Sequence, residues 1–255
     1  MLNGGTLRVA TQNIQWGGDP APGGDGNPRL TRLIPHLTRQ NADVLVLTEH
    51  KSGRRGNELA LLLQDSGYQY LLHRTPGPPA LGTAIASRLP VTEIELPIRS
   101  DNESWRSLAV RVVGVDVVGF YFPLRDAKAP YWDWVLANAA AMLDRDVLLI
   151  GDFNTGKQGI DEVGRTLDSA EKQAALEDIG FVDTWRAANP EGRDYTWFSS
   201  AGNGFRLDYI WASPSLAHRV KSIYHDHEAR LSGASDHAAV ITEIALPLPV
   251  DGSDA

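Results

Sequence analysis

The stretch LLIGDFNTG, residues 148–156, is an apolar run that stops abruptly on a carboxylate and an amide. Its Leu and Ile content is typical of a buried strand. A strand that simply leaves the core closes on a turn residue, and Asp152 and Asn154 taken alone fit that interpretation. The alternative is that both side chains point at a common target. The rest of the chain decides between the two.

Further strands are predicted by short runs rich in Val, Ile, Tyr and Phe. These runs cover residues 6–14, 42–50, 68–73, 82–87, 106–113, 115–122, 146–152, 206–213 and 238–246. The helical stretches between them are 29–40, 57–67 (with Asn57 as its N-cap), 131–144 and 169–180. Strands and helices do not alternate regularly, so the pattern favours two packed sheets with helices outside.

Composition limits the possible classes of protein. The chain has 255 residues, 42% hydrophobic and 22% charged, which is ordinary for a globular protein. Because it has no cysteine, it has no disulfide, thiolate metal site or cysteine nucleophile. It shows neither a signal-peptide pattern nor an apolar run of the roughly 20 residues that span a bilayer. We therefore expect a cytoplasmic, monomeric protein without a membrane segment, with one domain over residues 1–247 and a disordered tail at 248–255.

The net charge of −8 argues against a surface that binds polyphosphates over its whole area. It is compatible with local phosphate recognition, because a carboxylate cluster that holds a divalent cation adds negative charge to the total. Non-specific affinity for DNA should be weak and sensitive to salt.

Oxygen-bearing side chains lie at the ends of many predicted strands. Each one alone is more easily explained as a turn former, and a lone His237 as a solvated residue. If the sheets bring these ends together, the set would suit a hard cation such as Mg²⁺ better than zinc. Periodicity alone does not show that they converge. The side chains are those of Asn13, Glu49, Tyr121, Asp152, Asn154, Asp208 and Asp236.

The motifs QNI, TEHK, YFP, GDFN, GFRLDY and SDH occur in the order and approximate spacing of the endonuclease/exonuclease/phosphatase superfamily, which the chain resembles from about Leu7 to Ile244. The segments GFVDTWRAANP, YTWF and GFRLDYIWAS look most like its exonuclease III and abasic-site endonuclease branch. The resemblance implies a four-layer αββα sandwich of two mainly antiparallel sheets flanked by helices, with a pseudo-two-fold axis between its halves. It also implies cleavage of phosphate esters, DNA above all, with Mg²⁺ or Mn²⁺ at one edge of the sheets.

The same resemblance implies which residues lie at the metal and which one activates the water. Glu49 matches the metal ligand, with Asn13 beside it and Asp236 near the metal or the leaving group. Asp152 matches the carboxylate that orients or deprotonates the attacking water. The chemistry asks for these groups independently, since attack on a phosphodiester builds negative charge that a cation stabilises and needs a base for the water.

Other matching positions contact the phosphate. The resemblance implies that Asn154 and Tyr121 hold the scissile group. It implies that His237 bonds a phosphate oxygen and is oriented by Asp208, an arrangement that keeps a histidine in one tautomer. Arg106 matches a further phosphate contact.

An apolar slot receives the flipped, base-less sugar in abasic-site enzymes, and the matching positions here are Trp197, Phe205 and Leu207. That all three are ordinary core side chains is an almost equally good interpretation. Lys51 matches the lysine of the family's ETK motif and begins the basic run KSGRR, so it is a candidate phosphate contact.

The chain also departs from the branch. Leu124 stands where the family usually has Asn or Gln to hold phosphate, and Arg125 could compensate. Gln15 replaces the usual Asn or Asp, and the loop at 199–203 is short. These departures favour the alternative of a phosphatase or phosphodiesterase for a small phosphorylated molecule. A non-catalytic binding module is a third hypothesis, and the retained carboxylates argue against it because unpaired buried charges are costly.

His225 and His227, in YHDHE, resemble a metal-binding pair. They alternate along a strand or loop without a third histidine nearby, so we do not expect a metal site there.

Overall fold

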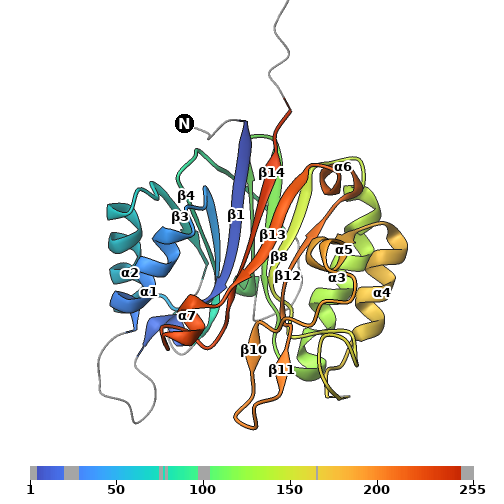
Figure 1. The fold of residues 1–255 in the computed structure, drawn as a ribbon. Coiled ribbons are helices and arrows are strands. Elements are labelled where there is room, and N and C mark those ends of the chain that lie inside the picture. The colour runs from blue at the N-terminus through green and yellow to red at the C-terminus, as the bar shows by residue number, and fades with distance from the viewer. Residues whose placement is uncertain are drawn as a thin grey trace, which may run out of the picture.

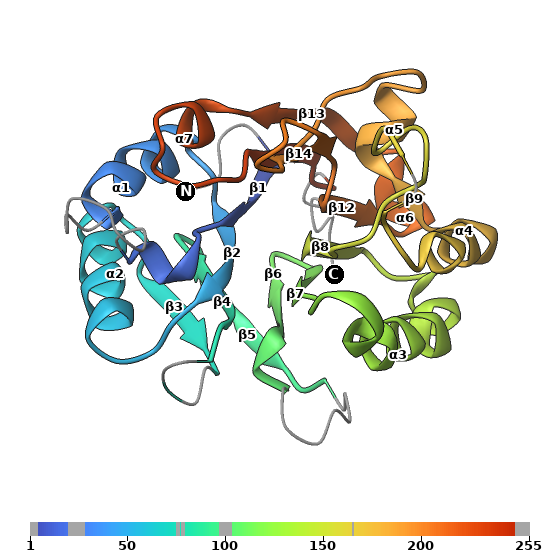
Figure 2. The same cartoon turned by 90° about the horizontal axis from the view of Figure 1, so that it is seen from below.

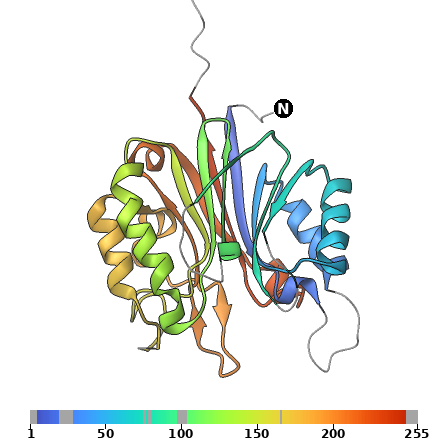
Figure 3. The same ribbon diagram turned by 180° about the vertical axis from the view of Figure 1, so that it is seen from behind.

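The computed structural model describes residues 5–19, 29–74, 77, 80–96, 104–164 and 166–247; the predicted tail at 248–255 lies outside the described residues. Two six-stranded sheets lie face to face, and helices cover the outer face of each (Figure 1). Figure 3, seen from behind, shows the green and yellow helices on one side and the blue ones on the other, with the strands between. The predicted αββα arrangement is confirmed.

The first sheet has the strand order β13-β14-β1-β2-β4-β3. Its central pair, β1 and β2, is parallel and the other pairs are antiparallel. The strands are β1 (Thr6–Asn13), β2 (Val44–His50), β3 (Tyr70–His73), β4 (Gly82–Ser87), β13 (Val220–Asp226) and β14 (Ala239–Ala245).

The second sheet has the order β5-β6-β7-β8-β12-β9. It repeats the pattern of the first, because only its central pair, β7 and β8, is parallel. The sheets are therefore mainly antiparallel, as predicted. The strands are β5 (Thr92–Ile94), β6 (Ser107–Val112), β7 (Val115–Tyr121), β8 (Val147–Asp152), β9 (Val182–Asp183) and β12 (Asp208–Ala212).

Helices form the outer layers (Figures 1 and 2). On the first sheet they are α1 (Leu30–Arg39), α2 (Arg54–Asp65) and α7 (Glu228–Leu231). On the second side they are α3 (Ala129–Ala139), α4 (Ala170–Ile179), α5 (Thr184–Ala188) and α6 (Pro214–Ala217). Within the described ranges, no helix is long and apolar enough to cross a membrane.

The alternation of side chains along the strands explains the layers. In β2, Val44 and Val46 belong to the core between the two sheets, whereas Leu45 and Leu47 pack under the helices of the first sheet. Successive side chains of a strand point to opposite faces, so a strand that is apolar at every position must be covered on both faces. The uninterrupted apolar runs thus require helices outside as well as a second sheet inside.

Two of the differences between the prediction and the structure concern helix α2 and strand β13. Helix α2 begins at Arg54 with Gly53 at the N-cap, so Asn57 lies inside its first turn and does not cap it. The pattern of residues 220–226 does not predict a strand, yet they form β13, which is an edge strand with a β-bulge and several exposed side chains. Edge strands need only one apolar face, which weakens their signal.

Candidate functional site

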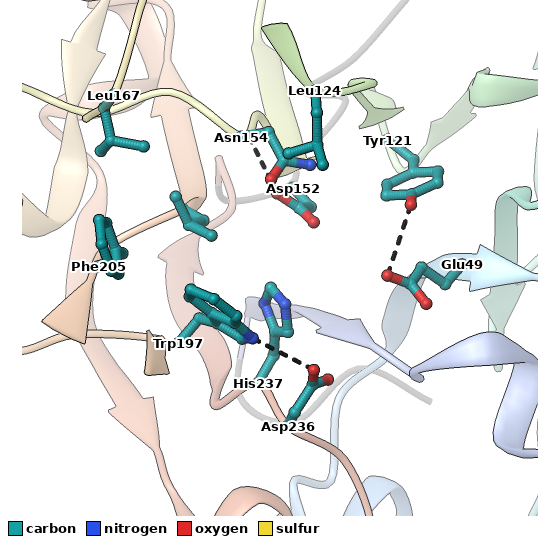
Figure 4. Close-up of a pocket in the computed structure, with 11 residues that line it drawn as sticks. Glu49, Tyr121, Leu124, Asp152, Asn154, Leu167, Trp197, Phe205, Asp236 and His237 are labelled. Atoms are coloured by element: carbon teal, nitrogen blue, oxygen red, sulfur yellow. Dashed lines mark hydrogen bonds between the residues drawn. The ribbon is translucent and has the colours of Figure 1, made fainter. Parts of the chain in front are cut away.

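The ends of strands from both sheets meet around one cavity of about 280 Å³, at the end of the sandwich from which the hairpin of β10 (Trp197–Phe198) and β11 (Gly204–Phe205) projects (Figures 1 and 4). Apolar side chains lie at the left of the close-up, and Glu49 and Tyr121 lie at the right. The predicted site residues that line the cavity are Glu49, Tyr121, Asp152, Asn154, Trp197, Phe205, Leu207, Asp236 and His237.

Strand register brings three of the polar groups side by side. Asp152 ends β8, with Tyr121 of β7 beside it on one side and Asp208 of β12 on the other. The backbone then turns sharply, because the Asp152 carboxylate accepts the backbone N–H of Asn154 at 3.0 Å. The Asn154 amide donates in turn to the Phe122 carbonyl at 2.9 Å. The GDFN motif is thus a strand end whose polar side chains are held by backbone groups, one within the motif and one just after β7.

Gly151 makes this strand end possible, and its replacement by alanine should strongly destabilise the protein. Its φ is +135°, and an added Cβ would lie 2.0 Å from the backbone oxygen of Phe120 on the neighbouring strand. Both features penalise any side chain, so we expect Gly151→Ala to destabilise the protein by more than about 3 kcal/mol. Urea unfolding measures this loss, and a change below about 1 kcal/mol would contradict the tight approach.

Glu49 reaches the cavity through an irregularity in β2. The pairing of β2 with β4 shifts register between Thr48 and His50, and Glu49 between them has a φ of +60°. A bulge of this kind turns one side chain out of the pleat. The carboxylate of Glu49 accepts the backbone N–H of Trp16 at 2.7 Å.

Asn13 connects the two sheets at the site. Its side-chain nitrogen donates to Glu49 Oε1 at 3.2 Å and to Asp152 Oδ2 at 3.1 Å. Its side-chain oxygen accepts the backbone N–H of Gln15 at 2.9 Å, which fixes the orientation of the amide. This buried amide therefore presents its nitrogen, and not its oxygen, to the two carboxylates.

His237 is paired with Asp208, as the resemblance implied. Its Nδ1 lies 2.8 Å from Asp208 Oδ2, and both side chains are buried. Burial by itself would lower the pKa of His237, but the charge and hydrogen bond of Asp208 raise it to about 10. His237 is thus an imidazolium at neutral pH, with Nδ1 held by Asp208. The Ser235 hydroxyl also accepts the backbone N–H of His237 and donates to the Asn13 carbonyl, so the SDH loop is tied to β1.

Asp152 is buried among like charges. Burial and the neighbouring Asp208 carboxylate raise its pKa to about 8, although His237 opposes this rise. One oxygen of Asp236 is also buried and finds no hydrogen-bond partner among the described residues. The carboxylates at the site offer only oxygen ligands, and one of these oxygens is buried and unsatisfied. Such a set fits a hard divalent cation, whose charge would offset the repulsion between the carboxylates.

Metal-free protein should lose stability as the pH rises. The pKa of Asp152 in the folded state, about 8, lies above the value of about 4 for an unfolded aspartate. The contribution of Asp152 to the free energy of unfolding is therefore fully present below about pH 4 and is lost as the pH rises toward about 8. His237, whose folded pKa is about 10, acts in the same direction from about pH 6.5 upward. Urea midpoints in EDTA should fall over this range, and a rising midpoint would contradict the buried repulsion.

The apolar half of the cavity lies on the β10–β11 hairpin and the segment after it. The rings of Trp197 and Phe205 are 5.5 Å apart, and the Trp197 indole N–H donates to Asp236 Oδ2 at 3.2 Å. Arg206 between Phe205 and Leu207 is buried and paired with Asp161 and Asp183. Because such a buried pair is costly to break, it anchors the two apolar side chains beside it.

Three basic side chains were predicted to contact phosphate, namely Arg106, Lys51 and Arg125. The Arg106 guanidinium stacks over the Tyr121 ring at 4.8 Å, at the edge of the site. Lys51 is paired with Asp19, at 2.6 Å, and is not part of the cavity lining. Arg125 is exposed and does not belong to the cavity lining, because the backbone turns through a positive φ there and Leu124 lines the wall instead.

Some residues at the site were not predicted from the sequence. Leu167 lines the cavity and extends its apolar side. Buried Lys128 donates to the Asn154 carbonyl and pairs with Asp168. Buried Arg29 contributes positive charge near Asp236 and Glu49. Ser235, which ties the SDH loop to β1, was not predicted either. It could have been found because it belongs to the SDH motif, whereas Leu167, Lys128 and Arg29 have no local sequence signal.

Comparison with known proteins agrees with this fold. A model described as the endonuclease/exonuclease/phosphatase family matches residues 10–237. An AP endonuclease from Archaeoglobus fulgidus is similar in structure, with a TM-score of 0.76 and 24% identity over 92% of this chain and 98% of that chain. A 3′-5′ exonuclease, NExo, from Neisseria meningitidis has a TM-score of 0.75 and 25% identity over 93% and 99% of the two chains. A variant of the 3′ phosphatase NExo from Neisseria, bound to a product DNA hairpin, has a TM-score of 0.77 and 26% identity with the same coverage.

Proposed function

The chain belongs to the endonuclease/exonuclease/phosphatase family, and on that premise we propose that it is a divalent-metal-dependent phosphodiesterase acting on DNA, with abasic sites or blocked 3′ ends as its targets. The observation that carries the proposal is a single cavity that joins Glu49, Asp152 and the His237–Asp208 pair to an apolar wall. A phosphate ester fits the charged side, and a sugar without its base fits the apolar side.

Glu49 and Asp236 are the proposed ligands for Mg²⁺ or Mn²⁺. Bound there, the cation would supply positive charge against the phosphate oxygens. Asn13 is better suited to hold Glu49 and Asp152 in place than to bind the metal, since its oxygen is occupied by the Gln15 N–H. This refines the role that the resemblance implied for Asn13.

Asp152 is the proposed base for the attacking water. Its carboxylate is oriented by the Asn154 N–H and by the Asn13 amide. Burial and Asp208 raise its pKa to about 8, and a base whose pKa lies near the working pH transfers protons efficiently.

His237 is the proposed donor to a phosphate oxygen. Asp208 accepts the hydrogen bond from Nδ1–H, so Nε2–H is left to donate to an oxygen on which negative charge develops. Tyr121 and Asn154 line the same cavity and are proposed to hold the remaining phosphate oxygens, with Arg106 supporting Tyr121.

The apolar wall of Trp197, Phe205 and Leu207 is proposed to exclude an intact base and to accept a bare sugar. Extruding a nucleotide costs a few kcal/mol, least at a damaged site. The two NExo structures are described as a 3′-5′ exonuclease and a 3′ phosphatase, and a terminal sugar needs no extrusion from a duplex. This likeness supports 3′ ends as a target beside abasic sites.

A small phosphate ester is the second candidate. Leu124, 67% exposed, stands at the cavity where a phosphate-holding amide is usual in the family. The hairpin loop 199–203 is short and carries no bulky wedge for a duplex. Both features weaken binding to DNA and leave the residues proposed for hydrolysis unchanged.

The test is hydrolysis by purified protein with Mg²⁺ or Mn²⁺. The substrates are an abasic duplex, a duplex with a 3′-phosphate, an intact duplex, single-stranded DNA and an aryl phosphodiester. Cleavage of the first two at rates well above the intact duplex is the expected result. Turnover of the aryl ester alone would favour the small-molecule candidate, and turnover of none would exclude both.

A further inference from the structure

A second group of metal-competent side chains shares no residue with the cavity. It consists of Asp194, His225 and His227, whose ligand atoms all lie within 4.8 Å of one another. Asp194 Oδ2 lies 3.1 Å from His225 Nδ1, and Asp194 Oδ1 lies 2.9 Å from His227 Nε2. Both imidazoles therefore direct a nitrogen at the same carboxylate.

The tertiary structure supplies the third group that the sequence pattern lacks. His225 lies near the end of β13, in the first sheet, and His227 follows that strand at the N-cap of α7. Asp194 comes from the segment between α5 and β10 and precedes the two histidines by 31 and 33 residues. The sequence pattern was examined for a third histidine, whereas the third donor here is an aspartate from a different part of the chain.

The surroundings suit metal binding. The His225 side chain is fully buried and stacks on Trp185 with ring centroids 4.8 Å apart, so its position is rigid. The side chains of Asp194 and His227 are 44% and 25% exposed, which gives an ion access from solvent.

We propose that Asp194, His225 and His227 bind a transition-metal ion such as Zn²⁺. Two imidazole nitrogens and one carboxylate oxygen form a zinc-type donor set, whereas Mg²⁺ prefers oxygen alone. Three protein ligands leave one position of a tetrahedral ion for water. The ion would join the edge strand of one sheet to the segment that leads into Trp197 of β10, and so would stabilise the apolar wall.

The experiment uses the full chain stripped of metal with chelator, and it titrates Zn²⁺ in excess Mg²⁺ so that the oxygen-rich cavity is occupied. We expect one zinc equivalent to bind and to raise the melting temperature by about 5–10 °C at saturation. Replacing zinc by Co²⁺ should give the intense visible absorption of a four-coordinate ion. Magnesium alone should produce neither effect.

Two variants and one control identify the ligands. His227→Ala and Asp194→Asn should each lose the zinc equivalent, with affinity reduced at least about 100-fold, and two variants guard against a folding defect in either. His218→Ala changes an exposed histidine outside the cluster and should bind zinc like the wild type. Unchanged zinc binding in both cluster variants, or no binding by the wild type, would overturn the proposal. Since hydrolysis is not the readout, failure here leaves the proposed function untouched.

Discussion

Replacing Asp152 with asparagine should lower kcat by about 10³-fold at saturating Mg²⁺, within the range expected for loss of a general base. The amide has nearly the same shape but cannot accept the proton of the attacking water. The carboxylate is buried and its two oxygens accept from the Asn13 amide and the Asn154 N–H, of which asparagine can keep only one, so some loss of placement adds to the loss of the base. Single-turnover hydrolysis of the preferred substrate measures the effect.

Stability separates this interpretation from a folding defect. Burial and Asp208 disfavour the charged form of Asp152, so without metal the Asp152→Asn variant should be at least as stable as the wild type. This is the stability–activity trade-off expected of a strained site. Asp133→Asn, at an exposed surface pair with Lys172, is the matched control and should keep full activity. A variant with near-wild-type kcat would remove Asp152 from its proposed role.

The second large effect is expected at His237. His237→Gln should reduce kcat by about 10²- to 10³-fold, the usual cost of losing a donor to a developing oxyanion. Glutamine retains a hydrogen-bonding group, but it carries no charge and does not reproduce the pairing of His237 with Asp208. His218→Gln, at an exposed position, is the control.

Asp208→Asn tests whether the charge of His237 matters. Asp208 is the main group that raises the pKa of His237 to about 10, so its replacement should lower that pKa. The activity of the variant should then fall at a lower pH than that of the wild type, while activity at acid pH is partly retained. If activity falls at the same alkaline pH in the variant and in the wild type, the imidazolium form of His237 is not needed. A role in folding alone would lower activity equally at every pH.

Much of the fold follows from local sequence. The apolar runs at Val44–Leu47 and Leu148–Ile150 are covered on both faces, and alternation assigns each residue to the inner core or to the core beneath the helices. Motif identity also placed polar side chains at the strand ends that line the cavity. The weak edge strand β13 and the short helices α5, α6 and α7 were not predicted, because each depends on packing against distant elements for its stability.

What the sequence by itself determined is most of the long strands, the alternation of their faces, and which polar groups stand at their ends. Only the tertiary structure decided their meeting: Asn13 bonds Asp152 across 139 residues of chain, and Asp194 meets His225 across 31. It also turned Arg125 away from the cavity and brought Leu167 into it. Periodicity acts over a few neighbouring residues, whereas distances between far-apart side chains are set by how the two sheets pack and which strands pair.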